Sequence, residues 1–133
     1  MFYNFELAIP AQTPESSPAT LDCKLTQGII TEVNFLFPLG CKGLAHVVVN
    51  HLLHQLYPLN PEGSFASDNE VIHFFDRYSL LAAPYVLRMR GWNDDDSYAH
   101  TITMRLELAE GPPPEAAPAT PGIIERLKLA LGV

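Results

Sequence analysis

Five histidines are the residues of this chain whose type and spacing most readily suggest chemistry. His46, His51 and His54 lie close together in the sequence, and His73 and His100 lie elsewhere. Neutral imidazole nitrogens are common ligands of zinc. The candidate ligands of a metal site are His46, His51, His54 and His100. A strand would place His51 and His54 on opposite faces, and no nearby acidic residue or cysteine completes a usual ligand set. We therefore expect no metal and no cofactor, and hydrogen-bonded histidines at strand ends or subunit contacts.

The acidic run at residues 94–96 is a second candidate, this time for calcium. The spacing of a helix-loop-helix calcium site fails here, because Tyr98 occupies the fifth position and no glycine follows at the sixth. We expect an acidic hairpin tip that contains Asx turns.

Patterns for covalent or acid–base catalysis are weak. No serine lies in a Gly-x-Ser-x-Gly elbow, and Cys41 lacks a family signature. Asp68 and Glu70 could form a carboxylate pair, but acidic residues beside a turn are ordinarily solvated. Gly40 and Gly43 have the wrong spacing for a nucleotide-binding loop. The sequence therefore predicts a protein that is not an enzyme.

Three aromatic residues near loops, Tyr57, Phe65 and Trp92, could form a sugar-binding platform. We expect them instead to cap the core or to lie in a subunit interface, where aromatic side chains are enriched.

Composition limits the classes of protein further. A chain of 133 residues with 47% hydrophobic content can bury one core but hardly two, so we expect one domain. The net charge of −7 opposes binding to nucleic acid and to anionic membranes. The N-terminus shows no signal peptide, because no basic region precedes an apolar stretch. Cys23 and Cys41 are predicted to be small buried hydrophobes, and the sequence leaves open whether they pair.

Alternation of apolar and polar residues positions these candidates on strands. Residues 2–9, 21–25 and 29–37 each carry apolar side chains at every second position, as antiparallel sheets require when one face meets water. Residues 10–19 are rich in Pro, Ser and Thr and predict an extended connector over the surface.

The central segment 44–57 can be drawn as one helix or as two strands. We favour two strands with a turn at Asn50-His51, because three consecutive valines restrict χ1 and disfavour a helix. Residues 58–63 are dense in turn formers, and residues 71–80 predict a strand that leads into a loop. Residues 85–90 and 98–108 flank the acidic run and predict a β-hairpin. The fold class is therefore all-β, a single antiparallel β-sandwich of the jelly-roll or Ig-like kind over residues 1–110.

The C-terminal residues 111–133 predict an arm. Consecutive prolines at 112–114 favour polyproline II and a semi-rigid spacer, and a short amphipathic helix is predicted to follow. A helix of this length is marginal alone, so we expect it to form when docked. Folding back on its own sheets is the alternative to docking on another subunit. The residues predicted to contact partners are Phe2, Phe5, Ile123, Ile124, Leu127 and Leu131.

Four segments carry a resemblance to a known class of proteins. They are residues 28–33 (GIITEV), 37–44 (FPLGCKGL), 91–93 (GWN) and 100–103 (HTIT). With them the chain resembles small β-sandwich proteins encoded among the virion structural genes of tailed phages, some of which decorate capsids. The resemblance implies a non-enzymatic subunit, present in many copies, whose arms reach over neighbouring subunits.

We therefore expect a structural subunit of a homo-oligomer or a larger assembly such as a capsid, located in a virion or in the cytoplasm. The alternative is a small metal-dependent jelly-roll enzyme or a sugar-binding module.

Overall fold

The segments with alternating apolar and polar side chains form eight β-strands within the first 111 residues. The computed structural model describes residues 1–111, so the predicted arm and its helix lie outside the described residues. The strands are β1 (Phe2–Ile9), β2 (Ala19–Lys24), β3 (Gly28–Phe37), β4 (Ala45–His51), β5 (His54–Tyr57), β6 (Glu70–Leu80), β7 (Val86–Asn93) and β8 (His100–Ala109). Within residues 1–111, no helix is long and apolar enough to cross a membrane.

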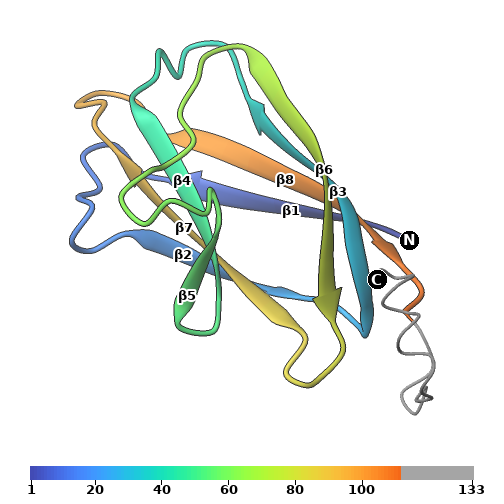
Figure 1. Cartoon of the computed structure of the whole chain (residues 1–133). Coiled ribbons are helices and arrows are strands. Elements are labelled where there is room, and N and C mark those ends of the chain that lie inside the picture. The colour runs from blue at the N-terminus through green and yellow to red at the C-terminus, as the bar shows by residue number, and fades with distance from the viewer. Residues whose placement is uncertain (112–133) are drawn as a thin grey trace, which may run out of the picture.

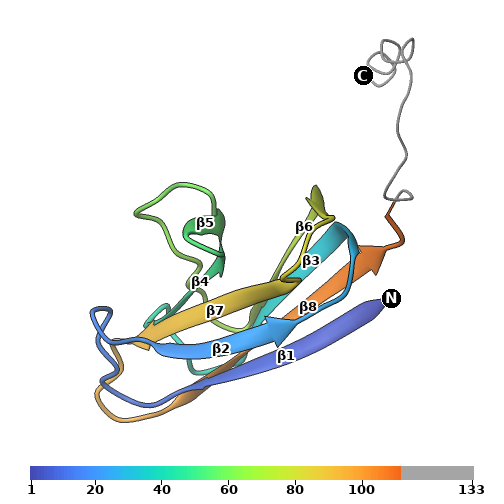
Figure 2. The ribbon, with the colours of Figure 1, turned by 90° about the horizontal axis from the view of Figure 1, so that it is seen from below.

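The strands form two four-stranded sheets in the orders β1-β8-β3-β6 and β2-β7-β4-β5. All pairings are antiparallel, and the sheets lie face to face (Figures 1 and 2). Every connection except β4–β5 passes from one sheet to the other. This order is that of a jelly roll, the double-sheet architecture of eight strands and two Greek keys. The predicted β-sandwich is confirmed, and the jelly-roll variant of the prediction is the one that the topology matches.

The core fills the space between the sheets with side chains from alternate positions of each strand. On β8, for example, Ile102, Met104 and Leu106 are fully buried, while Thr101 and Arg105 are exposed. The sheets approach closely at Gly91, where an added Cβ would lie 2.5 Å from Cδ1 of Ile9. A side chain at this position would therefore push the β1 edge away from β7.

Two strands, β4 and β5, occupy the central segment, as predicted. The turn between them, however, is at Leu52 and Leu53 and not at Asn50-His51, since His51 pairs with His54 across a two-residue loop. The predicted turn position is wrong because Asn50 and His51 both keep their strand pairing, Asn50 with Gln55 and Arg88 and His51 with His54.

The predicted hairpin of residues 85–90 and 98–108 is wrong. β7 pairs with β2 and β4, whereas β8 pairs with β1 and β3 in the other sheet. Residues 94–99 connect β7 in one sheet to β8 in the other. Because β7 and β8 are both largely apolar, each can occupy a central position with a neighbouring strand on each side. In addition, β6 is one continuous edge strand with a register shift opposite Ile30 and Glu32.

The sandwich is open on one side. β5 and β6 are the edge strands at this side, one in each sheet, and the views of Figures 1 and 2 show them standing apart. The candidate functional site lies at this opening, between β5 and β6.

Candidate functional site: an aromatic groove between β5 and β6

A groove of about 500 Å³ lies between β5, β6 and the loop that joins them. Most of its lining is apolar or aromatic, which is typical of sites that bury an apolar ligand or a partner side chain. We call it the aromatic groove. Its lining residues are His54, Leu56, Tyr57, Pro58, Leu59, Phe65, Phe74, Phe75, Asp76 and Tyr78.

The β5–β6 loop forms one wall of the groove, and Gln55 holds it in place. Nε2 of Gln55 lies within hydrogen-bond distance of three loop carbonyls, those of Pro58 (2.7 Å), Asn60 (3.0 Å) and Gly63 (3.1 Å). Further along, Phe65 exchanges two backbone hydrogen bonds with Val47 of β4. The wall is therefore tied to the sheet at both ends.

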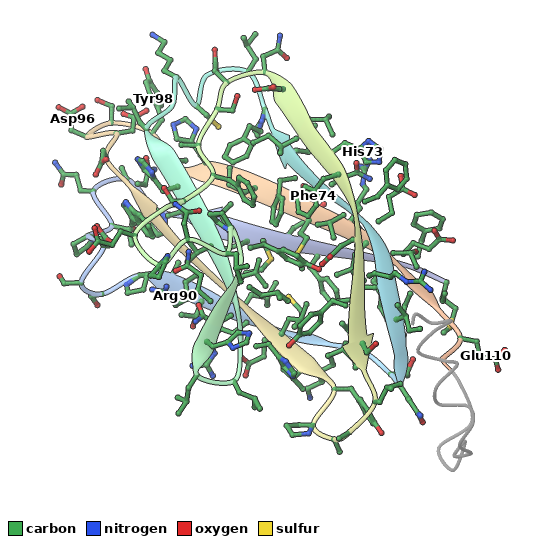
Figure 3. The ribbon with its side chains drawn as sticks, viewed as in Figure 1. His73, Phe74, Arg90, Asp96, Tyr98 and Glu110 are labelled. Atoms are coloured by element: carbon green, nitrogen blue, oxygen red, sulfur yellow. The ribbon has the colours of Figure 1, made fainter. Side chains whose placement is uncertain are left out.

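Aromatic rings form the floor of the groove and connect it to the core. The Phe74 ring lies 5.3 Å from the Tyr57 ring and 5.9 Å from the Phe65 ring, measured between centroids, and Phe65 in turn lies 4.9 Å from the buried Phe35. Such tilted and edge-to-face pairs add to the stabilisation that burial supplies. Figure 3 shows Phe74 and its neighbour His73 leaving β6 on opposite sides, with Phe74 directed toward the space between the sheets.

Three polar side chains of the groove, Tyr57, Asp76 and Tyr78, are paired with one another or with an adjacent side chain. The Tyr57 hydroxyl donates to Oδ2 of Asp76 at 2.6 Å, and burial, reinforced by this bond, raises the pKa of Tyr57. The Tyr78 hydroxyl lies 2.5 Å from Nδ1 of His51. Burial lowers the pKa of His51, with His54 adding to the effect, which favours the neutral form of the ring. The groove therefore presents apolar surface with few polar groups left for a ligand.

The tip of the β4–β5 hairpin extends the apolar surface beside the groove. Leu53 is fully exposed and Leu52 is 64% exposed, and Leu52 has a φ of 57°. Positive φ at this turn position favours Gly or Asn, because a Cβ clashes with the backbone there. Two smaller grooves, of about 450 and 380 Å³, share Leu52 in their lining and are bounded by Pro84 of the β6–β7 loop. A strained Leu52 beside a fully exposed Leu53 favours neither turn geometry nor solubility.

The structure does not gather the histidines into a metal site. His51 and His54 face each other across the β4–β5 turn, whereas His46, His73 and His100 each bond to an acidic partner elsewhere. Among residues 1–111, no three His, Cys, Asp or Glu side chains are placed to hold a metal ion.

His46 belongs instead to a chain of residue types that resembles a hydrolytic triad. Its Nδ1 lies 2.9 Å from Oγ of Ser64, and its Nε2 lies 3.3 Å from Oδ2 of Asp94. In a triad the carboxylate is buried and fixes the ring, whereas Asp94 is 60% exposed. Ser64 does not line the aromatic groove, and the His46 ring stacks on Trp92 at 5.1 Å. We interpret these contacts as structural, because they link His46 of β4 to Ser64 in the β5–β6 loop and to Asp94 in the β7–β8 connection.

The acidic run builds Asx turns, as predicted, although not at a hairpin tip. Oδ1 of Asp95 accepts the backbone N–H groups of Ser97 (2.9 Å) and Tyr98 (3.3 Å), and Oδ2 contacts Nε2 of His100 at 2.8 Å. These bonds, led by that from Ser97, hold the pKa of Asp95 below its usual value. The run therefore orders the β7–β8 crossing. Asp68 has a similar role, because its Oδ1 accepts the N–H groups of residues 40 and 42.

The predicted partner residues of β1 lie on opposite faces of the sheet. Phe2 is exposed, whereas Phe5 is half-buried, stacks on Tyr3 and packs against the core. The other four, Ile123, Ile124, Leu127 and Leu131, lie outside the described residues.

Of the three aromatic residues considered as a sugar-binding platform, two line the same groove and one does not. Tyr57 and Phe65 line the aromatic groove, while Trp92 is covered by His46. The sequence reasoning missed the role of Phe74-Phe75. Two adjacent aromatic residues in a strand must point to opposite faces, and this was the available signal that one of them would be exposed.

The two thiols are buried and unpaired, and burial raises the pKa of Cys23 to about 12 and also raises that of Cys41. The prediction that both are buried hydrophobes is confirmed.

No protein-family model matches the sequence, and no curated protein matches it. Among solved structures, a chain from the crystal structure of tomato aspermy virus is similar, with a TM-score of 0.43 and 12% sequence identity over 89% of this chain and 82% of that chain. A likeness at this level says nothing about function, which must come from the molecule itself.

Proposed function

We propose that this chain is a non-enzymatic structural subunit that assembles with copies of itself, and with them into a larger protein assembly such as a capsid. The observation that supports the proposal is the apolar surface along the open side of the sandwich. Its most exposed members are Leu52 (64%), Leu53 (100%), Leu59 (70%) and Phe75 (75%). Leu52 and Leu53 are adjacent at the hairpin tip, and Leu59 and Phe75 both line the aromatic groove. Clustered exposed apolar side chains mark sites of protein–protein interaction, whereas single ones are common on any surface. We call these four residues the open-side patch.

The energetics explain why the patch alone makes a marginal contact. Each large apolar side chain contributes about 1.5–3 kcal/mol if it is fully withdrawn from water. Four such side chains only just offset the loss of translational and rotational freedom on association, which costs about 4–15 kcal/mol. The predicted contacts of Phe2, Phe5 and the segment 123–131 would supply the surplus.

The setting that we propose is a virion, with the protein as a capsid-decorating subunit. Jelly rolls serve as capsid subunits but also as lectins and cupins, so the fold permits this role without selecting it. The resemblance to phage structural proteins favours it. The net charge of −7 favours a protein partner over nucleic acid or an anionic membrane.

Sedimentation velocity or mass photometry of the full chain tests the proposal. We expect a discrete oligomer or a closed shell. Deletion of residues 112–133 should lower that mass while the circular dichroism of the β-sandwich is retained. A full chain that stays monomeric at the highest soluble concentration, both alone and with a candidate shell, would contradict the proposal.

A sugar-binding module is the second candidate, and the aromatic groove is the observation that favours it. Sugars need several hydrogen bonds besides an aromatic face, whereas Tyr57, Asp76 and Tyr78 already have partners. Calorimetry with a panel of oligosaccharides tests this candidate. Heat that disappears in the Phe75→Ala variant would support it.

A further inference from the structure

The aromatic groove is open, apolar and larger than a single side chain requires. Its volume is about 500 Å³, and Phe75 and Leu59 are mainly exposed at its margins. Because Tyr57, Asp76 and Tyr78 already have hydrogen-bond partners, a ligand that brings several charges or hydroxyl groups into the groove would leave most of them unsatisfied. The chemistry of the groove therefore selects an apolar occupant.

The chain itself contains a segment of matching chemistry outside the described residues. In the segment 123–131, apolar residues Ile124, Leu127 and Leu131 recur at positions i, i+3 and i+7. This spacing is the pattern by which an amphipathic helix lays one face into a hydrophobic groove. The sequence predicts such a helix here, and its marginal length means that a groove must stabilise it.

Charge also favours this pairing. The whole net charge of −7 resides in residues 1–111, because residues 112–133 contain two acidic and two basic residues. Within the segment 123–131, Arg126 and Lys128 outnumber Glu125. A net positive segment would approach an acidic body that has Asp76 in the groove lining.

We infer that the aromatic groove of one copy is the receptor for the segment 123–131 of a second copy. This inference rests on the proposed function and names its contact surface. The described chain ends at Gly111, where an added Cβ would lie 2.9 Å from Cδ2 of Leu81, just beyond the end of β6. Twelve residues then lead to Ile123 and span about 37 Å if they adopt polyproline II.

The length of this spacer argues for a second copy. Along β6, the groove residues Tyr78 and Phe74 are three and seven positions from Leu81, or about 10–23 Å. A spacer with five prolines that adopts polyproline II would extend past its own groove, and its length would allow it to reach a groove on a neighbouring copy.

Disulfide trapping between two separate preparations of the full chain tests the inference. One preparation carries Leu127→Cys and the other carries Phe75→Cys, and they are mixed under mild oxidation at pH 8. The matched control replaces Phe75→Cys by Val71→Cys, which is 51% exposed on the same strand but outside the groove. The native thiols should not interfere, because both are buried and their pKa values are raised.

We expect the Phe75→Cys preparation to be captured at least about tenfold faster than the Val71→Cys control, in line with an affinity advantage of roughly 1.4 kcal/mol. Equal rates in a protein that still oligomerises would overturn the inference and leave the proposed function standing. A monomeric protein would remove both. If the double variant Phe75→Cys with Leu127→Cys closes on itself and remains a monomer at high dilution, the groove serves its own chain and the second copy is excluded.

Discussion

Replacing the hairpin tip tests whether its two leucines serve the fold or a partner. The variant is Leu52→Gly with Leu53→Asn, a pair that suits a two-residue hairpin whose first residue has positive φ. Leu52 now adopts a φ of 57°, and a left-handed conformation costs a non-glycine residue about 1–2 kcal/mol. Glycine removes this strain but adds about 0.5–1 kcal/mol of unfolded-state entropy. We expect the free energy of unfolding of the monomer to stay the same or to rise by about 1 kcal/mol.

Assembly should respond in the opposite direction. Leu53 is fully exposed in the subunit, so burial against a neighbour would contribute about 1.5–3 kcal/mol. Its loss should weaken association by about 10- to 150-fold, since each 1.4 kcal/mol is a factor of ten. The assay pairs urea unfolding at several protein concentrations with sedimentation of the same samples, because association itself stabilises the native state.

A matched control is Leu39→Asn, which removes another largely exposed leucine from the turn between β3 and β4, and which should change neither quantity. If instead the hairpin variant loses stability while its association constant is unchanged, the leucine pair belongs to the fold, and the reasoning from strain and exposure fails.

Three further predictions concern the aromatic groove, the His51 side chain bonded to it and the β7–β8 crossing. First, the pKa of His51 is lowered in the folded state, so the unfolded chain binds more protons than the folded chain as the pH falls through 6.5. The free energy of unfolding should therefore be at its full value above that pH and decline below it. Urea unfolding between pH 5 and 8 should show this pH dependence, and His51→Gln should reduce it. Second, the lowered pKa of Asp95 places another loss below about pH 4, as the pH falls through the pKa of the folded state, and Asp95→Asn should remove that step in acid titrations. Third, Tyr57→Phe leaves Asp76 without its donor and should cost about 1.5–3 kcal/mol by urea unfolding, whereas a cost near zero would show that water replaces the hydroxyl.

The sequence determined the local elements of this protein because they depend on local physics. Period-two alternation marks a strand wherever one face is buried, so residues 2–9, the β-branched run of β4 and the loop at residues 58–63 could be predicted without knowledge of their neighbours. The burial of Cys23 follows for the same reason, since it occupies an apolar position of an alternating strand.

Only the tertiary structure decided which strands pair and which side chains meet. β7 and β8 are adjacent in sequence and look like a hairpin, but each strand pairs with two others from distant parts of the chain. The groove likewise joins residues 54–59, 65 and 74–78, and the bonds from Tyr57 to Asp76 and from Tyr78 to His51 cross between the two sheets. Several strands of this chain have similar apolar patterns, so each could pair with more than one non-local partner. Packing of the whole core decides which strands pair, and alternation within one strand carries no information about its partner.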